Sequence, residues 1–194
     1  MTTCLAISAG LQVNECLETQ FSRQQFPNGY KLVDGVAMHE ANGDRFVIPP
    51  DVLKRHIQPG QFVEVRIDSD RFSAHEADAA ECPCPSCSGP MSNPVLSHND
   101  PASLVPLPEQ SIPSRGWGED FWVRITKRQG RWMEARVDNR LVESRLHGVH
   151  LDDLILIEDV HVLTVHSSHR VELVKRMDAA DLKELALWLG STNG

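Results

Sequence analysis

The sequence lacks the features that mark several large classes of protein. It has no apolar run approaching the roughly 18 residues that a transmembrane helix requires. The first residues carry no basic cluster ahead of a long apolar stretch, so we expect no signal peptide and no membrane association. Gly-x-Ser-x-Gly, a phosphate-binding glycine loop and His-Glu-x-x-His are also missing. These absences favour a non-catalytic protein, although a catalytic site assembled from dispersed residues stays open.

Basic residues are missing from one long segment. Residues 73–114 carry five acidic residues and no Lys or Arg, whereas residues 115–150 have a local net charge of +3. The whole chain has a formal net charge of −8. This acidity disfavours a general nucleic-acid-binding protein but allows a small basic face on one module.

Eight of the twelve prolines fall within residues 73–116. Proline interrupts helices and central strands, so this segment is typical of a connector. We therefore predict three parts. Residues 1–72 form an N-terminal helix and a β module, residues 73–116 a Pro/Cys-rich connector, and residues 117–194 a second β module and a C-terminal helix.

The connector holds three of the five cysteines, Cys82, Cys84 and Cys87. Cys84-Pro-Ser-Cys87 resembles one knuckle of a zinc ribbon, in which two thiolates converge on a metal. Because a structural zinc site uses four ligands, His75 is our candidate for the fourth. An odd number of cysteines, three of them clustered, fits a reducing compartment, so we expect a cytoplasmic protein.

Other interpretations of the cysteines stay open. The fourth ligand could instead be His98, Cys4, Cys16 or a residue of a second chain. Cys84 and Cys87 also have the spacing of a thioredoxin-like redox pair, but Ser-Gly-Pro after them is a poor helix start. Three free thiols in a loop are the third alternative.

Periodicity predicts the elements of the first module. Val13, Leu17 and Phe21 favour a helix over residues 12–25. Residues 30–39 and 45–48 flank Asn42-Gly43 and are predicted to form a hairpin. We expect a short helix over residues 51–57 and a strand over residues 62–67.

The second module is predicted in the same way. A hairpin about Gly130 joins strands at residues 121–125 and 131–137, and further strands follow at 154–157 and 160–165. A helix over residues 178–189 has Asp178 as its N-cap, an apolar stripe of leucines and Gly190 as its C-cap. The predicted fold class is α+β: two small, barrel-like antiparallel β modules packed together, with helices at both ends.

Two groups of residues after the connector suggest binding. Trp117, Trp122 and Trp132 interleave with arginines, which would suit an RNA-binding barrel if the rings share one face. The alternative puts Trp122 and Trp132 inside and the arginines outside. Two His-x-x-His pairs, at 147–150 and 166–169, have the spacing of metal ligands on a helix but fall in predicted turns.

The segment from Asp120 to Ile157 resembles the bacterial YegJ-like family of small proteins. Members share a Phe-Trp-Val-x-Val-Thr strand, a turn glycine and a later Gly-Asp. The matches include Phe121-Trp122-Val123, Gly130 and Asn139, whereas Asp152-Asp153 departs from the Gly-Asp pattern. The resemblance implies a small β module and no known activity.

Together these observations predict a non-catalytic interaction or adaptor protein with a structural zinc site. A protein partner or self-association is expected, and nucleic acid is not favoured. A thiol-based redox protein or enzyme subunit is the first alternative, and a small RNA-binding β barrel is the second.

Overall fold

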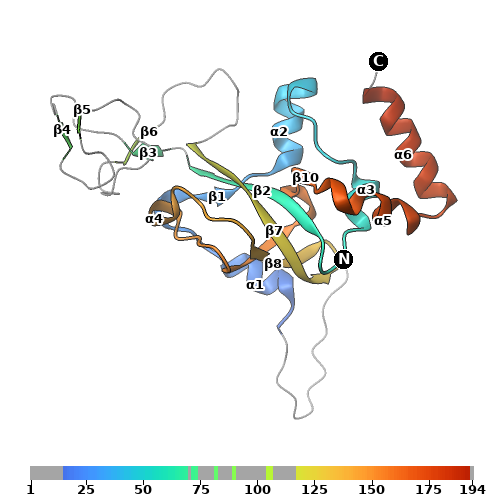
Figure 1. The fold of residues 1–194 in the computed structure, drawn as a ribbon, viewed down its shortest axis with the longest axis horizontal. Helices are drawn as coiled ribbons and strands as arrows, with labels where there is room; N and C mark the ends of the chain where they lie inside the picture. Colours follow the sequence, from blue (N-terminus) through green and yellow to red (C-terminus); the bar gives the residue numbers. More distant parts are fainter. Residues whose placement is uncertain are drawn as a thin grey trace, which may run out of the picture.

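The computed structural model describes residues 15–69, 71–73, 81–82, 89–90, 104–106 and 117–192. Within these residues the chain forms an α+β fold around one curled antiparallel sheet (Figure 1). Neighbouring strands follow the order β1-β2-β7-β8-β9, and β10 pairs with β2 beside β1. The strands are β1 (Lys31–Leu32), β2 (Phe62–Ser69), β7 (Trp117–Gln129), β8 (Trp132–Val137), β9 (Leu154–Glu158) and β10 (Thr164–Val165).

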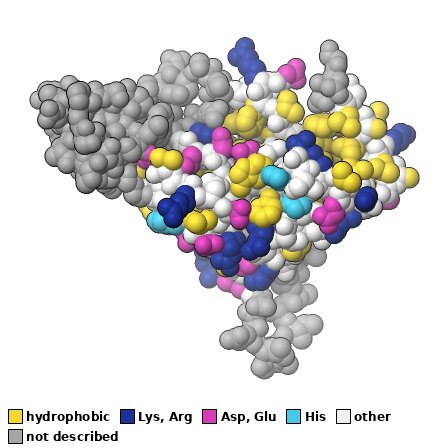
Figure 2. Space-filling model, viewed as in Figure 1, with side chains coloured by type: hydrophobic (Ala, Val, Ile, Leu, Met, Phe, Trp, Pro, Cys, Tyr) yellow, Lys and Arg dark blue, Asp and Glu magenta, His cyan; other side chains and the backbone are white. Residues whose placement is uncertain are grey.

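Helices stand at both ends of the described chain. The α-helices are α1 (Leu17–Arg23), α2 (Gly35–Asn42), α3 (Asp51–Arg55), α4 (Ser144–His147), α5 (Arg170–Lys175) and α6 (Ala179–Thr192). Four short 3-10 turns are η1 (Pro27–Gly29), η2 (Gly43–Arg45), η4 (Asp159–His161) and η5 (Ser167–His169). Helices α3, α5 and α6 lie on one side of the molecule in Figure 1, and hydrophobic side chains gather on that side in Figure 2.

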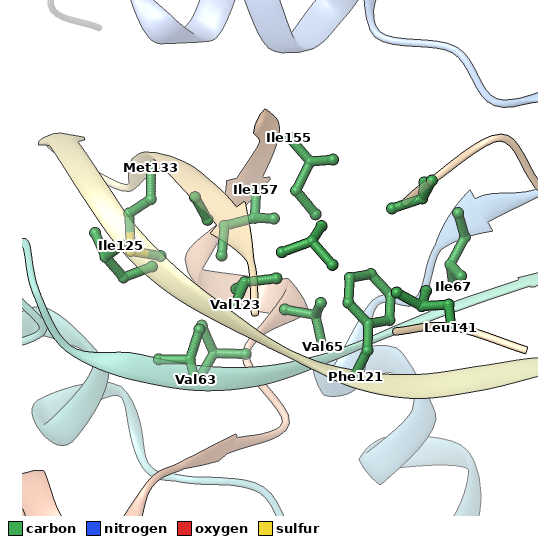
Figure 3. Packing of buried hydrophobic residues seen from close by; sticks show 14 of the residues in the cluster. Val63, Val65, Ile67, Phe121, Val123, Ile125, Met133, Leu141, Ile155 and Ile157 are labelled. Carbon is green, nitrogen blue, oxygen red and sulfur yellow. The ribbon is translucent and has the colours of Figure 1, made fainter. Parts of the chain in front are cut away.

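The inner face of the sheet carries the hydrophobic core (Figure 3). Alternate residues of each strand point inward, as the two-residue period of a β-strand requires. The buried strand residues are Val63, Val65, Ile67, Phe121, Val123, Ile125, Met133, Ala135, Val137, Ile155 and Ile157. The alternation in β7 shifts after Ile125, where a bulge leaves Thr126 outside the regular register.

The strands predicted for two modules form one sheet. β2 pairs with β7 over its whole length, from Phe62 opposite Arg124 to Ser69 opposite Trp117. The two predicted modules therefore share one core, because the connector returns the chain beside the strand it left. The boundaries at residues 73 and 116 stay a prediction. Short strands also pair at the start of the connector and within it: β3 (Arg71–Ser73) with β6 (Leu104–Pro106), and β4 (Glu81–Cys82) with β5 (Gly89–Pro90).

The hairpin predicted about Asn42-Gly43 is wrong. Residues 35–42 form α2 because Asp34 caps it: its carboxylate accepts hydrogen bonds from the N–H groups of Val36 (2.9 Å) and Ala37 (3.0 Å). Gly43 does adopt a positive φ of 56°, but it ends this helix instead of forming a hairpin turn. A local cap thus overrides the turn signal.

The other elements follow the predicted pattern with changed boundaries. The β7–β8 hairpin turns at Gly130, whose φ is +63°. Asp178 caps α6, accepting from the N–H groups of Ala180 (2.8 Å) and Asp181 (2.9 Å). The prediction that Gly190 ends this helix is wrong, since α6 continues to Thr192. Of the strand predicted over residues 160–165, only Thr164–Val165 pairs as a strand, and residues 159–161 form the 3-10 turn η4.

Candidate functional site

An apolar groove lies between α6 and the body of the protein. Its volume is about 350 Å³. The lining residues come from the segment before α3, from α3 itself, from β10 and from α5 and α6. They are Val47, Ile48, Pro49, Pro50, Leu53, Leu163, Thr164, Val165, Arg170, Val174, Leu185, Trp188 and Leu189. Arg170 is the one charged side chain among them.

Helix α6 is held at its N-terminal half. Asp181 accepts a hydrogen bond from Arg55 (3.0 Å) and is paired with His56 (2.7 Å). Glu184 is also bonded to Arg55, at 2.8 Å. Below these polar contacts, Leu185 packs with Val52 and Met177 in a small cluster. These contacts position α6 as one wall of the groove.

The C-terminal half of α6 leaves apolar surface open. Leu185 is only 8% exposed, whereas Leu189, one turn on, is 46% exposed. Leu182 is also exposed, and it lies on the same stripe as Leu189 because the two are seven residues apart. The predicted stripe of three leucines is therefore split: Leu185 is part of the core, Leu189 is exposed and lines the groove, and Leu182 is exposed outside the groove's lining.

A buried lysine lies under the same region. Lys54 of α3 is 1% exposed, and its Nζ has no hydrogen-bond partner among the described residues. Burial lowers the pKa of Lys54, and the carboxylates of Asp51, Asp159 and Asp34 oppose that shift only in part. The nearest of them, Asp51, is 3.9 Å away. A buried ammonium with so little compensation is costly to the fold.

A second recess opens on the outer face of the sheet, where side chains from β2 and β7 meet the turn after β10. Its volume is about 310 Å³. Aromatic and imidazole rings make most of its walls. The lining residues are Phe62, Trp122, Asp138, Asn139, His166, Ser168 and His169.

The predicted metal-ligand residues lie at the edge of what the structure describes. Cys82 lies in β4, opposite Gly89 in the antiparallel pairing with β5. Cys84, Cys87 and His75 lie outside the described residues. Cys16 is the residue before α1, and its Sγ is 3.1 Å from Thr19 Oγ1. Among the described residues no group of three His, Cys, Asp or Glu side chains is arranged to hold a metal.

The two His-x-x-His pairs have different environments. His147 is fully buried: its Nε2 lies 3.0 Å from Glu119, and its Nδ1 accepts from the Val149 N–H. Glu119 also accepts from two backbone N–H groups. Burial alone would raise the pKa of Glu119, but these hydrogen bonds outweigh it and lower that pKa. His147 is thus a buried, structural side chain, whereas its pair partner His150 is exposed. His166 and His169 both line the outer recess.

The basic, tryptophan-rich segment does not form one continuous surface. Arg128 binds Asp159 through two hydrogen bonds, Arg131 pairs with Glu158 and Lys127 pairs with Glu134. Trp132 lies against Phe21, with ring centroids 4.8 Å apart. Trp122 is on the outer face, because its neighbours Phe121 and Val123 point inward. The alternative with both tryptophans inside is therefore wrong for Trp122.

The sequence analysis predicted neither the apolar groove nor the outer recess, and the reason is the same for both. The groove needs the segment before α3 next to α6, and the outer recess needs Phe62 next to Trp122, contacts between residues far apart in the chain. The leucine stripe of α6 was the one local signal of the groove.

Comparisons with protein-family models, with curated proteins and with solved structures find no match for this chain. The resemblance of residues 120–157 to the YegJ-like family gains no support from them. None of the helices in the described ranges is long and apolar enough to cross a membrane.

Proposed function

We propose that this protein is a non-catalytic interaction protein, and that the groove beside α6 binds an apolar segment of a protein partner. The observation that carries the proposal is the open half of α6. Leu189 lies exposed in the wall of a groove whose other walls are mainly apolar. An amphipathic segment that buries such a surface gains roughly 25 cal/mol per Å² of apolar area removed from water.

The charge at the groove indicates what the partner segment carries. Arg170 contributes the one charged side chain of the lining, and its Nε donates to the carbonyl of Val165 at 3.5 Å. That weak bond leaves most of the guanidinium available to a carboxylate. We therefore infer that the occupant presents two or three apolar side chains and one acidic group. A second copy of this chain is the competing occupant.

A photocrosslinking experiment tests this function. A photoreactive amino acid is placed at Leu189 in one variant and at Leu187 in another; Leu187 lies on the opposite face of α6 and is 68% exposed. We expect a crosslinked partner from position 189 and little from position 187. Equal crosslinking from both positions, or none from 189, would contradict the proposal. A product with twice the chain's mass would identify self-association instead.

A variant pair gives an independent test. Leu189→Glu puts a carboxylate at the rim of the groove, and Leu187→Glu makes the same chemical change away from it. Binding of an identified partner should weaken about 10-fold or more with Leu189→Glu, since an apolar contact is replaced by a desolvated charge. Arg170→Gln should weaken it less and reduce its dependence on salt.

Zinc stays a separate proposal for the connector. Its support is the sequence pattern of Cys82, Cys84 and Cys87, with His75 as the fourth ligand. A reduced thiol cluster of this kind also fits a cytoplasmic protein. Elemental analysis of untagged protein purified without chelator should show up to one zinc per chain. Metal-free protein whose thiols react rapidly would support the redox or free-thiol alternatives.

A further inference from the structure

The recess on the outer face of the sheet has the composition of a site for a planar ligand. Phe62 comes from β2 and Trp122 from β7, and both side chains are partly exposed. His169 stacks on Phe62, with centroids 5.6 Å apart and planes 20° apart. His166 meets Trp122 edge to face at 5.2 Å. Figure 2 shows histidine and hydrophobic side chains together near the middle of this face.

The polar groups of the recess are oriented by the protein. His166 Nδ1 accepts from the Ser168 N–H at 3.4 Å and lies 2.7 Å from its hydroxyl. The neutral ring therefore carries its hydrogen on Nε2, which is a donor for a ligand. The side-chain oxygen of Asn139 accepts a hydrogen bond from the backbone N–H of Trp122 (2.7 Å), and its side-chain nitrogen donates to the Arg140 carbonyl (3.0 Å). These two bonds fix the Asn139 amide in the wall of the recess.

One imidazole of the recess has unused hydrogen-bonding capacity. His169 Nε2 is buried with no hydrogen-bond partner among the described residues, and Nδ1 is 3.9 Å from Glu172, beyond hydrogen-bond distance. Ring contacts, not hydrogen bonds, hold this side chain. A buried polar nitrogen without a partner is unfavourable, and a bound ligand that reorients the ring would remove that cost.

A free cation lies beside these rings. Arg124 is directly opposite Phe62 in the β2–β7 pairing, and it shares the outer face of β7 with Trp122. Its side chain is exposed and makes no ion pair within the described part of the chain, unlike Lys127, Arg128 and Arg131. Side chains that are cross-strand partners lie about 5 Å apart at Cβ, so the guanidinium can reach a group bound over Phe62.

We propose that this recess binds a nucleotide, with the base against Trp122 and Phe62 and the phosphate on Arg124. Aromatic side chains on a sheet stack bases, and arginine binds phosphate through paired N–H groups. Free nucleotide and single-stranded RNA share this chemistry. Arg128 and Arg131 are paired with Asp159 and Glu158, and Arg136, opposite Arg124, donates to the Asp152 carbonyl, so we infer a site for one nucleotide rather than a long track. This inference is independent of the groove beside α6.

Binding is measured by isothermal titration calorimetry with three probes: adenosine monophosphate, adenosine and a short oligoadenylate. The variants are Trp122→Leu and Arg124→Gln, and Lys127→Gln is the control on the same strand. Trp122→Leu should weaken every probe about 5- to 150-fold, the range reported for loss of base stacking. Arg124→Gln should weaken the two phosphate-bearing probes roughly 10-fold and leave adenosine unchanged. Lys127→Gln should change none of them.

The probes also separate the two sources of ligand. Oligoadenylate that binds more tightly than the mononucleotide, with affinity that falls steeply with salt, indicates single-stranded RNA. Equal affinities indicate a free nucleotide. The proposal is overturned if folded wild-type protein binds neither phosphate-bearing probe at millimolar concentration, or if Trp122→Leu and Arg124→Gln, both shown to be folded by their thermal melts, bind like the wild type.

Discussion

Acid should destabilise this protein through one buried histidine, His161. The side chain is 7% exposed, its Nδ1 accepts from the Glu158 N–H at 2.9 Å, and its ring stacks on Phe21 at 5.4 Å. The pKa of His161 is lowered to about 4, mainly by burial; the carboxylate of Asp34 opposes this shift, and the positive charges of Arg131 and Lys54 add to it.

The direction of the pH effect on stability follows from the protons bound in the folded and unfolded states. The unfolded chain takes up a proton near pH 6.5, whereas folded His161 stays neutral until about pH 4. Below pH 6.5 the unfolded state therefore binds more protons, and stability falls as the pH falls toward 4. Between pH 7.5 and pH 5 this one group should remove about 2 kcal/mol from the free energy of unfolding.

Urea denaturation at pH 7.5 and pH 5, followed by tryptophan fluorescence, measures this loss. His161→Asn keeps an acceptor near the Glu158 N–H but cannot titrate. We expect the wild type to lose about 2 kcal/mol more than this variant over the same interval. His150→Asn, which removes an exposed imidazole, is the control and should lose as much as the wild type. Equal losses in wild type and His161→Asn would refute the reasoning.

Three further predictions concern stability, measured as the free energy of unfolding in urea. Lys54→Met should be neutral or stabilise the fold by about 1–3 kcal/mol, because it removes a buried ammonium that has no hydrogen-bond partner among the described residues. A clear loss would mean that the surrounding carboxylates stabilise the charge. Leu185→Ala should cost about 2–5 kcal/mol and Leu187→Ala almost nothing, and similar small effects at both would show that α6 is not part of the core. Glu119→Gln should cost about 1–3 kcal/mol, since the backbone N–H groups and His147 lose a charged acceptor. Because the pKa of Glu119 is lowered in the folded state, its stabilising contribution should vanish as the pH falls through that pKa. If Glu119→Gln lost as much stability at acidic pH as the wild type does, this reasoning would be contradicted.

Sequence was informative wherever local interactions decide the structure. Asp178 begins α6 because its carboxylate bonds to N–H groups two and three residues away, and that geometry needs no distant partner. The β7–β8 hairpin forms because Gly130 accepts a positive φ between two alternating strands. The same alternation put Phe121, Val123 and Ile125 on the face opposite Trp122, but it did not decide which face is buried; the structure buries these three residues.

Local signals misled where two of them competed. Asn42-Gly43 indicated a hairpin, but Asp34 eight residues earlier caps a helix that runs into the same glycine. Gly190 has the chemistry of a helix end, yet α6 continues through it to Thr192. In both cases glycine permits a turn without requiring one.

Only the tertiary structure decided which strands are neighbours and where the binding surfaces lie. β2 and β7 are separated by the whole connector, and no periodicity within either strand specifies its partner; their pairing is set by closure of one shared core. That pairing brings Phe62 beside Trp122 and Arg124, and the packing of α6 on α3 opens the apolar groove. Local sequence thus determined the elements, whereas long-range burial determined both candidate sites.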